Sequence, residues 1–164
     1  MTRDANANPL TLDPLNPGPL QQRIIDLGAI QDANRTDFSG LRAKGGKILI
    51  AHGVHDGLVP NRESQQFMSR VRQTMGSAAV TDFMRYYEIP GYNHAVSTQF
   101  NAAWDSLTTL ENWVEKSTAP PPQIVADTAA VAGRTRPLCE YPSWPRYNGS
   151  GDVNLAASFT CVTQ

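Results

Sequence analysis

The clearest pattern of apolar and polar positions predicts a strand, a helix and a second strand in the middle of the chain. Residues 47–51 form a short apolar run after a glycine pair, which is typical of a buried parallel strand. Residues 61–75 place apolar side chains on one helical face and charged ones largely outside it. Residues 83–89 are rich in aromatic and apolar side chains and end at Pro90. This order predicts a right-handed crossover between two parallel strands.

Weaker patterns on both sides of this unit predict further helices. The apolar spacing from Leu20 to Leu27 predicts a short helix that stops at Gly28, and residues 37–42 predict another that ends at a glycine pair. Residues 101–116 show helical spacing, with tryptophans among the apolar positions, before a proline triplet prevents continuation. We interpret those tryptophans as core residues rather than as a platform for a ligand.

The two ends of the chain lack such periodicity. Residues 1–19 combine several prolines with Asn, Asp and Thr, and this composition buries too little surface to offset its ordering entropy, so we expect a mobile or surface-draped arm. Residues 20–164 are then one α/β domain, a size that the chain of 164 residues with 40% apolar content allows. The tail after residue 134 is expected to wrap the surface of that domain.

Charge and hydropathy narrow the classes of partner. The formal net charge is −1, and basic residues are scattered among acidic ones, so no extended positive field would attract nucleic acid or anionic lipid. No apolar run approaches the roughly 20 residues that cross a bilayer. The first residues also lack the apolar stretch of a secretory signal, so the chain as written would stay where it is made.

The two cysteines, Cys139 and Cys161, lie in a C-terminal segment rich in Pro, Gly and aromatic residues. A bridge between them would stabilise this segment by about 3 kcal/mol on chain-entropy grounds and would imply an oxidising compartment. The alternative is two unpaired thiols in a cytosolic protein, which the missing signal favours. The sequence therefore leaves the localisation open.

The residues able to carry chemistry follow the two predicted strands. All three histidines of the chain, His52, His55 and His94, fall in the loops 52–60 and 90–95. Loops at the carboxyl ends of parallel strands face a shared crevice, which makes this pair of loops the candidate site. Asp56 would hold one ring nitrogen of His94 and leave the other free to accept a proton. His52 has the alternative of packing against its own loop through hydrogen bonds.

Several short motifs resemble, in the same order, the landmarks of the tannase and feruloyl esterase family. They are Gly-Gly-Lys-Ile-Leu-Ile at 45–50, His-Gly with Asp-Gly-Leu-Val-Pro within 52–60, Ile-Pro-Gly with His within 89–94, and Arg-Thr-Arg-Pro-Leu-Cys with Tyr-Pro within 134–142. The similarity runs from about Phe38 to Cys161. It implies an α/β-hydrolase with a Ser, Asp and His triad that cleaves galloyl, feruloyl and related aromatic esters in proteins that are often secreted and rich in disulfides.

Carried over residue by residue, the resemblance gives Asp56 and His94 as the acid and the base. It also implies a disulfide between Cys139 and Cys161. The sequence departs from the family in two respects, since it contains no Gly-x-Ser-x-Gly nucleophile elbow and has Ala95 where the family has a cysteine after the catalytic histidine. The expected fold is a truncated α/β-hydrolase-like parallel sheet with flanking helices and a disulfide-stapled C-terminal tail.

Two strands cannot cover their own edges and faces, so we expect another chain to supply the cover. A homodimer, with exchanged arms or tails, satisfies both copies at once.

A missing elbow leaves three hypotheses for function, of which the first uses a metal. His52, His55 and His94, or two of them with Asp56, could hold zinc and leave one position open for water, whose lowered pKa would make it a hydroxide nucleophile. Such a site would cleave carboxyl esters, lactones or phosphate esters without a serine.

The second hypothesis is ester hydrolysis with a substitute nucleophile, for which Ser97 and Ser64 are the nearest candidates along the chain. The third is a catalytically inactive family member that serves as a binding or scaffold protein, using the old crevice near Tyr92 and Trp104. An ester hydrolase built on Asp56 and His94 is the leading prediction.

Overall fold

The polypeptide consists of two compact units, Met1–Arg35 and Thr36–Gln164. The computed structural model describes residues 4–163. In the first unit, two short 3₁₀ helices, η1 (Pro9–Thr11) and η2 (Gly18–Leu20), precede α1 (Gln21–Gln31), and none of these elements has a buried residue. The boundary between the units therefore falls after Arg35, whereas the sequence placed it after residue 19.

Helix α1 continues through the position where the sequence predicted its end, so the predicted stop at Gly28 is wrong. The Gly28 carbonyl accepts a hydrogen bond from the Asp32 backbone N–H at 2.8 Å, and Asp32 itself is extended. A glycine inside a helix costs only about 1 kcal/mol relative to alanine, which the surrounding turns of helix can absorb.

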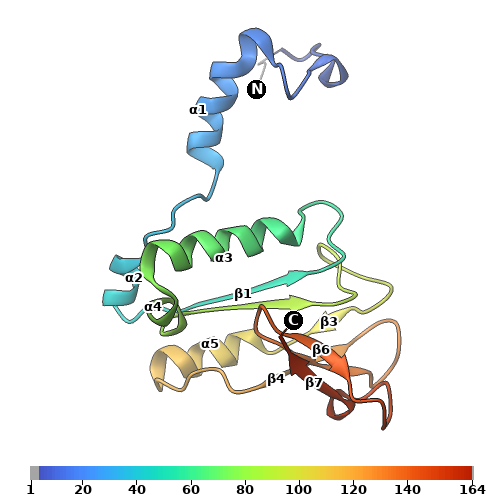
Figure 1. The fold of residues 1–164 in the computed structure, drawn as a ribbon. Coiled ribbons are helices and arrows are strands. Elements are labelled where there is room, and N and C mark those ends of the chain that lie inside the picture. The colour runs from blue at the N-terminus through green and yellow to red at the C-terminus, as the bar shows by residue number, and fades with distance from the viewer. Residues whose placement is uncertain (1–3, 164) are drawn as a thin grey trace. The chain divides into compact units, whose positions relative to one another are not determined.

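The second unit is built on two parallel strands, β1 (Ile48–Gly53) and β2 (Met84–Ile89), paired in register from Ile48 opposite Met84 to Gly53 opposite Ile89. They are joined by α3 (Asn61–Met75) and the short α4 (Ser77–Thr81), as Figure 1 shows. This confirms the strand, helix and strand predicted from the sequence.

Two further helices of this unit were also expected. Helix α2 (Ser39–Ala43) precedes β1, and α5 (Ser106–Glu115) follows a two-residue strand, β3 (Ala102–Ala103). The predicted helix 101–116 begins late because the Asp105 side chain accepts the Thr108 backbone N–H at 3.2 Å and caps the first turn there. None of the helices described is long and apolar enough to cross a membrane.

The β1–β2 pair has a hydrophobic core on each face, because successive residues of β2 point to opposite sides. Met84 and Tyr86 face α3 and α4, where they join a cluster of buried residues that also contains Met68, Val71, Val80 and Phe83. Tyr87 and Ile89 face the other way and pack with Phe100, Val125 and Leu138. The second cluster joins β2 to the C-terminal part of the chain and thereby supports the loops that follow both strands.

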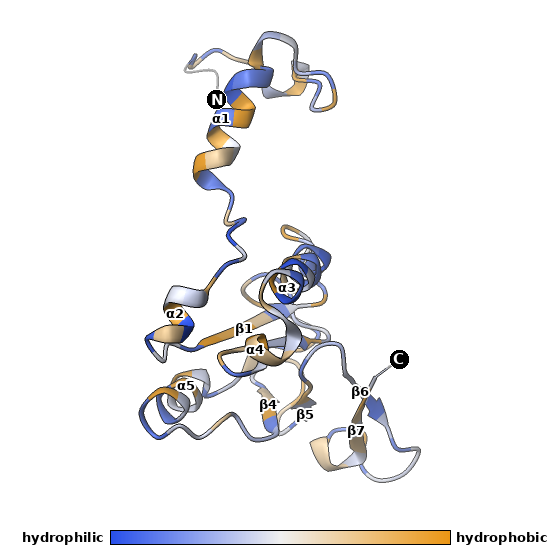
Figure 2. Cartoon of the chain, turned by 60° about the vertical axis from the view of Figure 1, so that its left-hand side comes forward, coloured by the Kyte–Doolittle hydropathy of each residue, from blue (hydrophilic) through white to orange (hydrophobic). Residues whose placement is uncertain are grey.

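Strand β1 is less buried than expected. Residues 48–50 are only partly buried and Ala51 is exposed, although Figure 2 shows the strand as a strongly apolar segment. Within residues 4–163 the sheet has only β1 and β2, so one edge of β1 pairs with no strand described there. The strand that the sequence predicted as buried is therefore only partly buried among the described residues.

The C-terminal part contains strands that the sequence did not predict. Strands β4 (Gln123–Asp127) and β5 (Thr135–Leu138) complete an antiparallel sheet with β3. Strands β6 (Trp144–Tyr147) and β7 (Phe159–Val162) form a second antiparallel pair, with a 3₁₀ helix, η3 (Ala156–Ser158), before β7. Both β5 and β6 are short and include a proline, which weakens a strand pattern in sequence.

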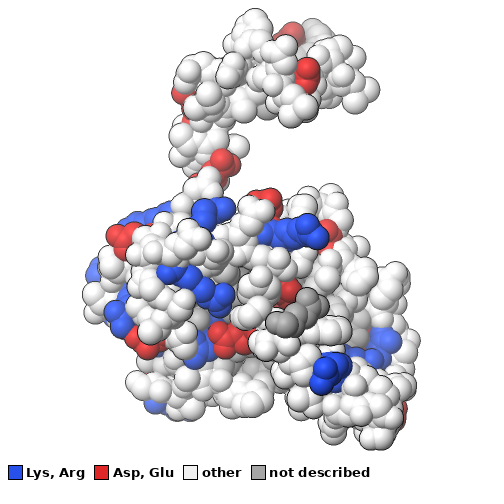
Figure 3. Space-filling view, viewed as in Figure 1, with Lys and Arg blue, Asp and Glu red and all other residues white. Residues whose placement is uncertain are grey.

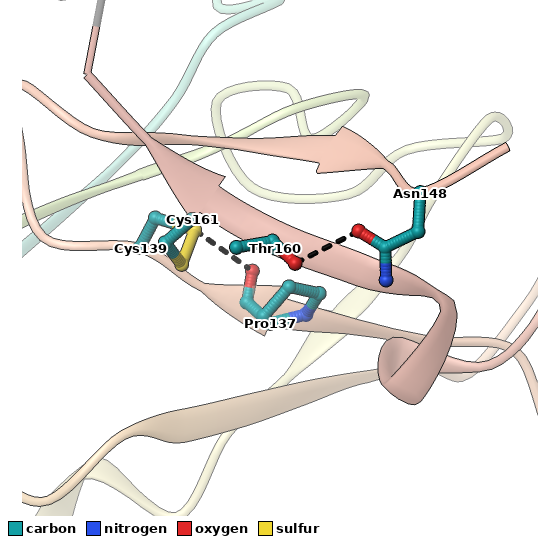
Figure 4. The surroundings of a disulfide bond; sticks show 5 residues. All are labelled: Pro137, Cys139, Asn148, Thr160 and Cys161. Atoms are coloured by element: carbon teal, nitrogen blue, oxygen red, sulfur yellow. Dashed lines mark hydrogen bonds between the residues drawn. A yellow bond between two sulfur atoms is a disulfide. The ribbon is translucent and has the colours of Figure 1, made fainter.

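A disulfide joins Cys139, just after β5, to Cys161 in β7, with 5.6 Å between their Cα atoms. Figure 4 shows its surroundings, where the Thr160 hydroxyl donates to Asn148 Oδ1 at 2.8 Å and Cys139 Sγ lies 3.9 Å from the Pro137 carbonyl oxygen. The bridge confirms the predicted pairing. It ties the β6–β7 pair to the strand that packs on the second core cluster.

Charged side chains of both signs are interspersed on the face of the 36–164 unit seen in Figure 3. This agrees with the balanced composition of the sequence. The prediction that nucleic acid and membranes are not partners stays a prediction.

Candidate active site

The loops after β1 and β2 meet in space because Gly53 has no side chain. A Cβ atom at Gly53 would overlap the backbone carbonyl oxygens of Tyr92 and Asn93. The close approach is fixed by a hydrogen bond from the His55 backbone N–H to the Tyr92 carbonyl, at 3.0 Å. The two loops are therefore held backbone against backbone, as their positions at the carboxyl ends of neighbouring parallel strands require.

Asp56 and His94 are brought together by this contact. The Nδ1 atom of His94 lies 2.9 Å from Oδ2 of Asp56. The Asp56 side chain is 4% exposed, whereas that of His94 is 50% exposed. Within residues 4–163, Nε2 of His94 has no hydrogen-bond partner. The predicted pair thus combines an enclosed carboxylate with an imidazole whose second nitrogen is available to a ligand.

The Asp56 carboxylate is held by its own loop as well. Its Oδ1 atom accepts the backbone N–H groups of Leu58 and Val59 at 2.8 and 2.9 Å. The hydrogen bond from Val59 is the main reason why the pKa of Asp56 lies well below its usual range, and His94 lowers that pKa further while burial opposes the shift. Asp56 is therefore an anion at neutral pH and can only accept hydrogen bonds from His94.

His52 contacts the same carboxylate oxygen as His94. Its Nε2 atom is 3.2 Å from Asp56 Oδ2 and 3.0 Å from the Val59 carbonyl oxygen, and its Nδ1 atom is 2.8 Å from the Ser64 hydroxyl. The side chain is only 13% exposed. The interpretation of His52 as a packed residue that bonds its own loop is supported, although one of its bonds goes to helix α3.

The predicted metal set is not assembled. Within the described part of the chain, no group of three or more His, Cys, Asp or Glu side chains is arranged to hold a metal ion. The exposed His55 uses Nδ1 to accept the Gly91 backbone N–H at 3.2 Å, and both ring nitrogens of His52 already have partners. The described residues therefore give no support to zinc on His52, His55, His94 and Asp56, because the i,i+3 spacing leaves the first two rings on different partners, and the metal stays an untested prediction.

Neither predicted substitute serine is bonded to His94. Ser97 is 7% exposed, and its hydroxyl donates to the Gly91 carbonyl at 2.6 Å. The same oxygen accepts the Gln99 backbone N–H at 3.2 Å, so Ser97 shapes the loop that carries His94. The hydroxyl of Ser64 lies beside His52 instead.

Sequence reasoning missed the residues that brace these loops. Asn93 Oδ1 accepts the His94 backbone N–H at 2.8 Å and the Gly57 N–H at 3.4 Å, so it links the two loops next to the acid and the base. The enclosed carboxylate of Asp127 receives Arg134 at 2.6 Å, and Arg134 also donates to the Gln99 carbonyl. The contacts of Asn93 with Gly57 and of Arg134 with Gln99 join segments 36 and 35 positions apart, and for this reason no local pattern indicates them.

Comparisons with known proteins show the family to which the chain belongs. Residues 1–162 match the family described as tannase and feruloyl esterase. The chain is 40% identical over 162 residues to an uncharacterised esterase of Agrobacterium fabrum, covering 98% of this chain and 29% of that protein. It is 39% identical over 135 residues to the mono(2-hydroxyethyl) terephthalate hydrolase of Piscinibacter sakaiensis, covering 79% of this chain and 22% of that protein.

Among solved structures, feruloyl esterase B from Aspergillus oryzae superimposes with a TM-score of 0.74 at 24% identity, covering 85% of this chain and 32% of that one. This likeness shows that the two chains share a fold. The chain spans less than a third of the length of each of these three proteins.

Proposed function

The chain belongs to the tannase and feruloyl esterase family, and from that premise we propose that Asp56 and His94 are the acid and the base of a carboxylic-ester hydrolase site. The observation that carries the proposal is the 2.9 Å contact between Asp56 Oδ2 and His94 Nδ1, with Nε2 left without a partner among the described residues. In hydrolytic triads the imidazole works in this orientation, with its second nitrogen turned to the nucleophile.

The two residues divide the work of proton transfer. Asp56, as a carboxylate, keeps the hydrogen of His94 on Nδ1 and stabilises the imidazolium that forms during the reaction. His94 Nε2 takes the proton of the attacking hydroxyl while its oxygen bonds to the ester carbonyl carbon. The same proton then passes to the alkoxide oxygen as the ester C–O bond breaks, and the alcohol departs.

The attacking group does not come from the two loops themselves. The sequence has no Gly-x-Ser-x-Gly, and the hydroxyls of Ser64 and Ser97 are bonded elsewhere. When this chain is assayed alone, we propose that the group that His94 deprotonates is water. General-base catalysis of this kind contributes about 10²- to 10⁴-fold, so activated esters are the substrates on which turnover is measurable.

The substrates we propose are esters of aromatic carboxylic acids. Two of the relatives have names that specify feruloyl and terephthalate esters. We infer an apolar rim from four exposed aliphatic side chains in or next to the two loops: Val54 (39%), Leu58 (77%), Val59 (44%) and Val96 (73%). Such a rim suits an aromatic acyl group better than the dianion of a phosphate ester.

The test is to measure hydrolysis of p-nitrophenyl acetate, methyl ferulate and p-nitrophenyl phosphate by the purified chain, with and without a chelator. We expect chelator-insensitive turnover of the carboxylic esters that is lost in His94→Ala. His55→Gln is the matched control, because glutamine keeps an acceptor for the Gly91 N–H and His55 does not bond Asp56.

Equal turnover by the wild type and His94→Ala would contradict the assignment. Turnover no faster than that in buffer would favour the binding or scaffold alternative, which NMR titration with ferulate would then examine.

A further inference from the structure

One oxygen of the Asp56 carboxylate contacts two histidines. Oδ2 lies 2.9 Å from His94 Nδ1 and 3.2 Å from His52 Nε2, while Oδ1 accepts two backbone N–H groups. A carboxylate offers about four acceptor positions, and all of them are occupied here. The proposed acid therefore has no free hydrogen-bonding capacity, and its orientation depends on all its donors together.

The tautomer of His52 follows from its neighbours. Nε2 faces two groups that can only accept, the Asp56 carboxylate and the Val59 carbonyl, so Nε2 must carry a hydrogen. In the neutral ring Nδ1 is then an acceptor, and it lies 2.8 Å from the hydroxyl of Ser64, which can donate. Ser64 thus completes the hydrogen bonding of a ring that is 13% exposed.

Ser64 is itself held on a rigid element. It lies near the start of α3, and the same helix buries Met68 and Val71 in the core beneath β1 and β2. Among the neighbouring polar groups, Glu88 Oε1 accepts hydrogen bonds from Asn61, Gln65 and Tyr86. The Tyr86 hydroxyl also interacts with the hydroxyl of Ser64. Two successive contacts, from Ser64 to His52 and from His52 to Asp56 Oδ2, therefore connect the core helix to the proposed acid.

We propose that His52 and Ser64 are positioning residues that hold the Asp56 carboxylate in the orientation that receives His94 Nδ1–H. They act through Asp56 and touch neither the substrate nor His94. The effect of these residues on catalysis rests on the function proposed above, whereas their contacts with Asp56 do not depend on it. The two backbone hydrogen bonds hold Oδ1, and the N–H of His52 adds a contact that holds Oδ2.

The same contacts have a competing interpretation, in which Ser64, His52 and Asp56 form a second triad with Ser64 as nucleophile. The two interpretations differ in one observable property. A positioning serine does not react with a fluorophosphonate ester, whereas a nucleophilic serine becomes phosphonylated. Mass spectrometry that locates the label on Ser64 would overturn the positioning role.

The main test is NMR of the full chain labelled with ¹⁵N-histidine, recorded at about pH 8. Two-bond ¹⁵N–¹H correlations distinguish the tautomers. In the wild type we expect His52 as the Nε2–H form and His94 as the Nδ1–H form. In His52→Ala we expect His94 to lose its single tautomer, and His52→Gln, which keeps a side-chain N–H donor, should restore it.

Ser64→Ala gives a second measurement that survives if His52→Ala does not fold. We expect it to turn His52 into a mixture of tautomers, whereas Ser69→Ala, an exposed position on the same helix, should change neither histidine. A wild-type His52 in the Nδ1–H form, a wild-type His94 in the Nε2–H form, or a His94 spectrum unchanged in His52→Ala would overturn the proposal.

Kinetics separate this inference from the proposed function. If the chain turns over an activated ester, His52→Ala should lower kcat about 10- to 100-fold with little change in KM, and His52→Gln should recover most of that loss. If the wild type shows no turnover, the proposed function fails, while the tautomers and their response to the variants still decide the role of His52.

Discussion

His94 Nδ1 lies 2.9 Å from Asp56 Oδ2 although 38 positions separate the two residues in sequence. The contact depends on backbone geometry more than on the two side chains, because Gly53 lets the two loops approach and Asn93 links them. The contact joins the enclosed carboxylate of Asp56 to the half-exposed imidazole of His94. Several of the expectations below follow from this one relationship.

Replacing Asp56 by asparagine should remove the charge that holds the His94 tautomer while preserving the shape of the side chain. We expect ester turnover to fall by up to about 10⁴-fold, as in other hydrolytic triads, with KM little changed. Steady-state kinetics on an activated ester measure this effect. Asp152→Asn, an exposed substitution far along the chain, is the control, and a loss of similar size in that variant would contradict the assignment.

The stability of the fold should depend on pH through Asp56. Its pKa is lowered in the folded state, mainly by the Val59 N–H, so the stabilisation is present above the ordinary carboxyl pKa of about 4 and is lost as the pH falls toward the folded-state value. Urea unfolding of wild type and Asp56→Asn should therefore differ more at about pH 7 than at about pH 3. A difference that grows on acidification would have the wrong sign.

Gly53→Ala should destabilise the protein and separate the two loops. The added Cβ would overlap backbone carbonyls that cannot move without the whole loop 91–97, and overpacking of this kind costs about 1–3 kcal/mol. Gly57→Ala is the matched control in the same loop, since nothing lies within 4 Å of its added Cβ. Denaturant midpoints measure the cost, and equal midpoints for the two variants would contradict the close approach.

The disulfide should stabilise the C-terminal part of the chain. Reduction, or the double replacement Cys139→Ser and Cys161→Ser, should lower the free energy of unfolding by about 3 kcal/mol. Unfolding followed with and without reductant tests this expectation. The double variant should be insensitive to reductant. If reductant frees both thiols of the wild type without changing its free energy of unfolding, the bridge contributes nothing to stability.

Self-association stays a prediction. The β1–β2 pair leaves one edge of β1 without a strand among the described residues, and such an edge favours pairing with a second chain. We expect a homodimer by size-exclusion chromatography with light scattering. A well-folded monomer would refute this.

The sequence predicted the elements that have a regular local pattern of apolar and polar residues. Strands β1 and β2 and helix α3 follow from periodicity and from the residues that end each element, and α3 was predicted at its observed bounds. Strands β4 to β7 were missed, because short segments such as the one around Pro137 gain their order from partners elsewhere in the chain and from the disulfide.

For the site, sequence spacing located the loops but not the orientation of the rings. Asp56 and His94 were paired correctly, since position after parallel strands and resemblance to a family pointed to the same residues. His55 was grouped with His52 on spacing alone, and it bonds Gly91 instead. The contact of His52 with Ser64 joins a loop to a helix, and no pattern along the chain announces it.

Because Asp56 is enclosed and His94 is half-exposed, the surroundings of the base can be changed separately from those of the acid. The acid is fixed by its own loop and by His52, so its geometry tolerates changes made elsewhere. The base lies on a loop whose next residues, Ala95 and Val96, are exposed. Substitutions at those two positions would change which substrates reach His94 and would leave the contacts of Asp56 intact. They are therefore suitable targets for a combinatorial library.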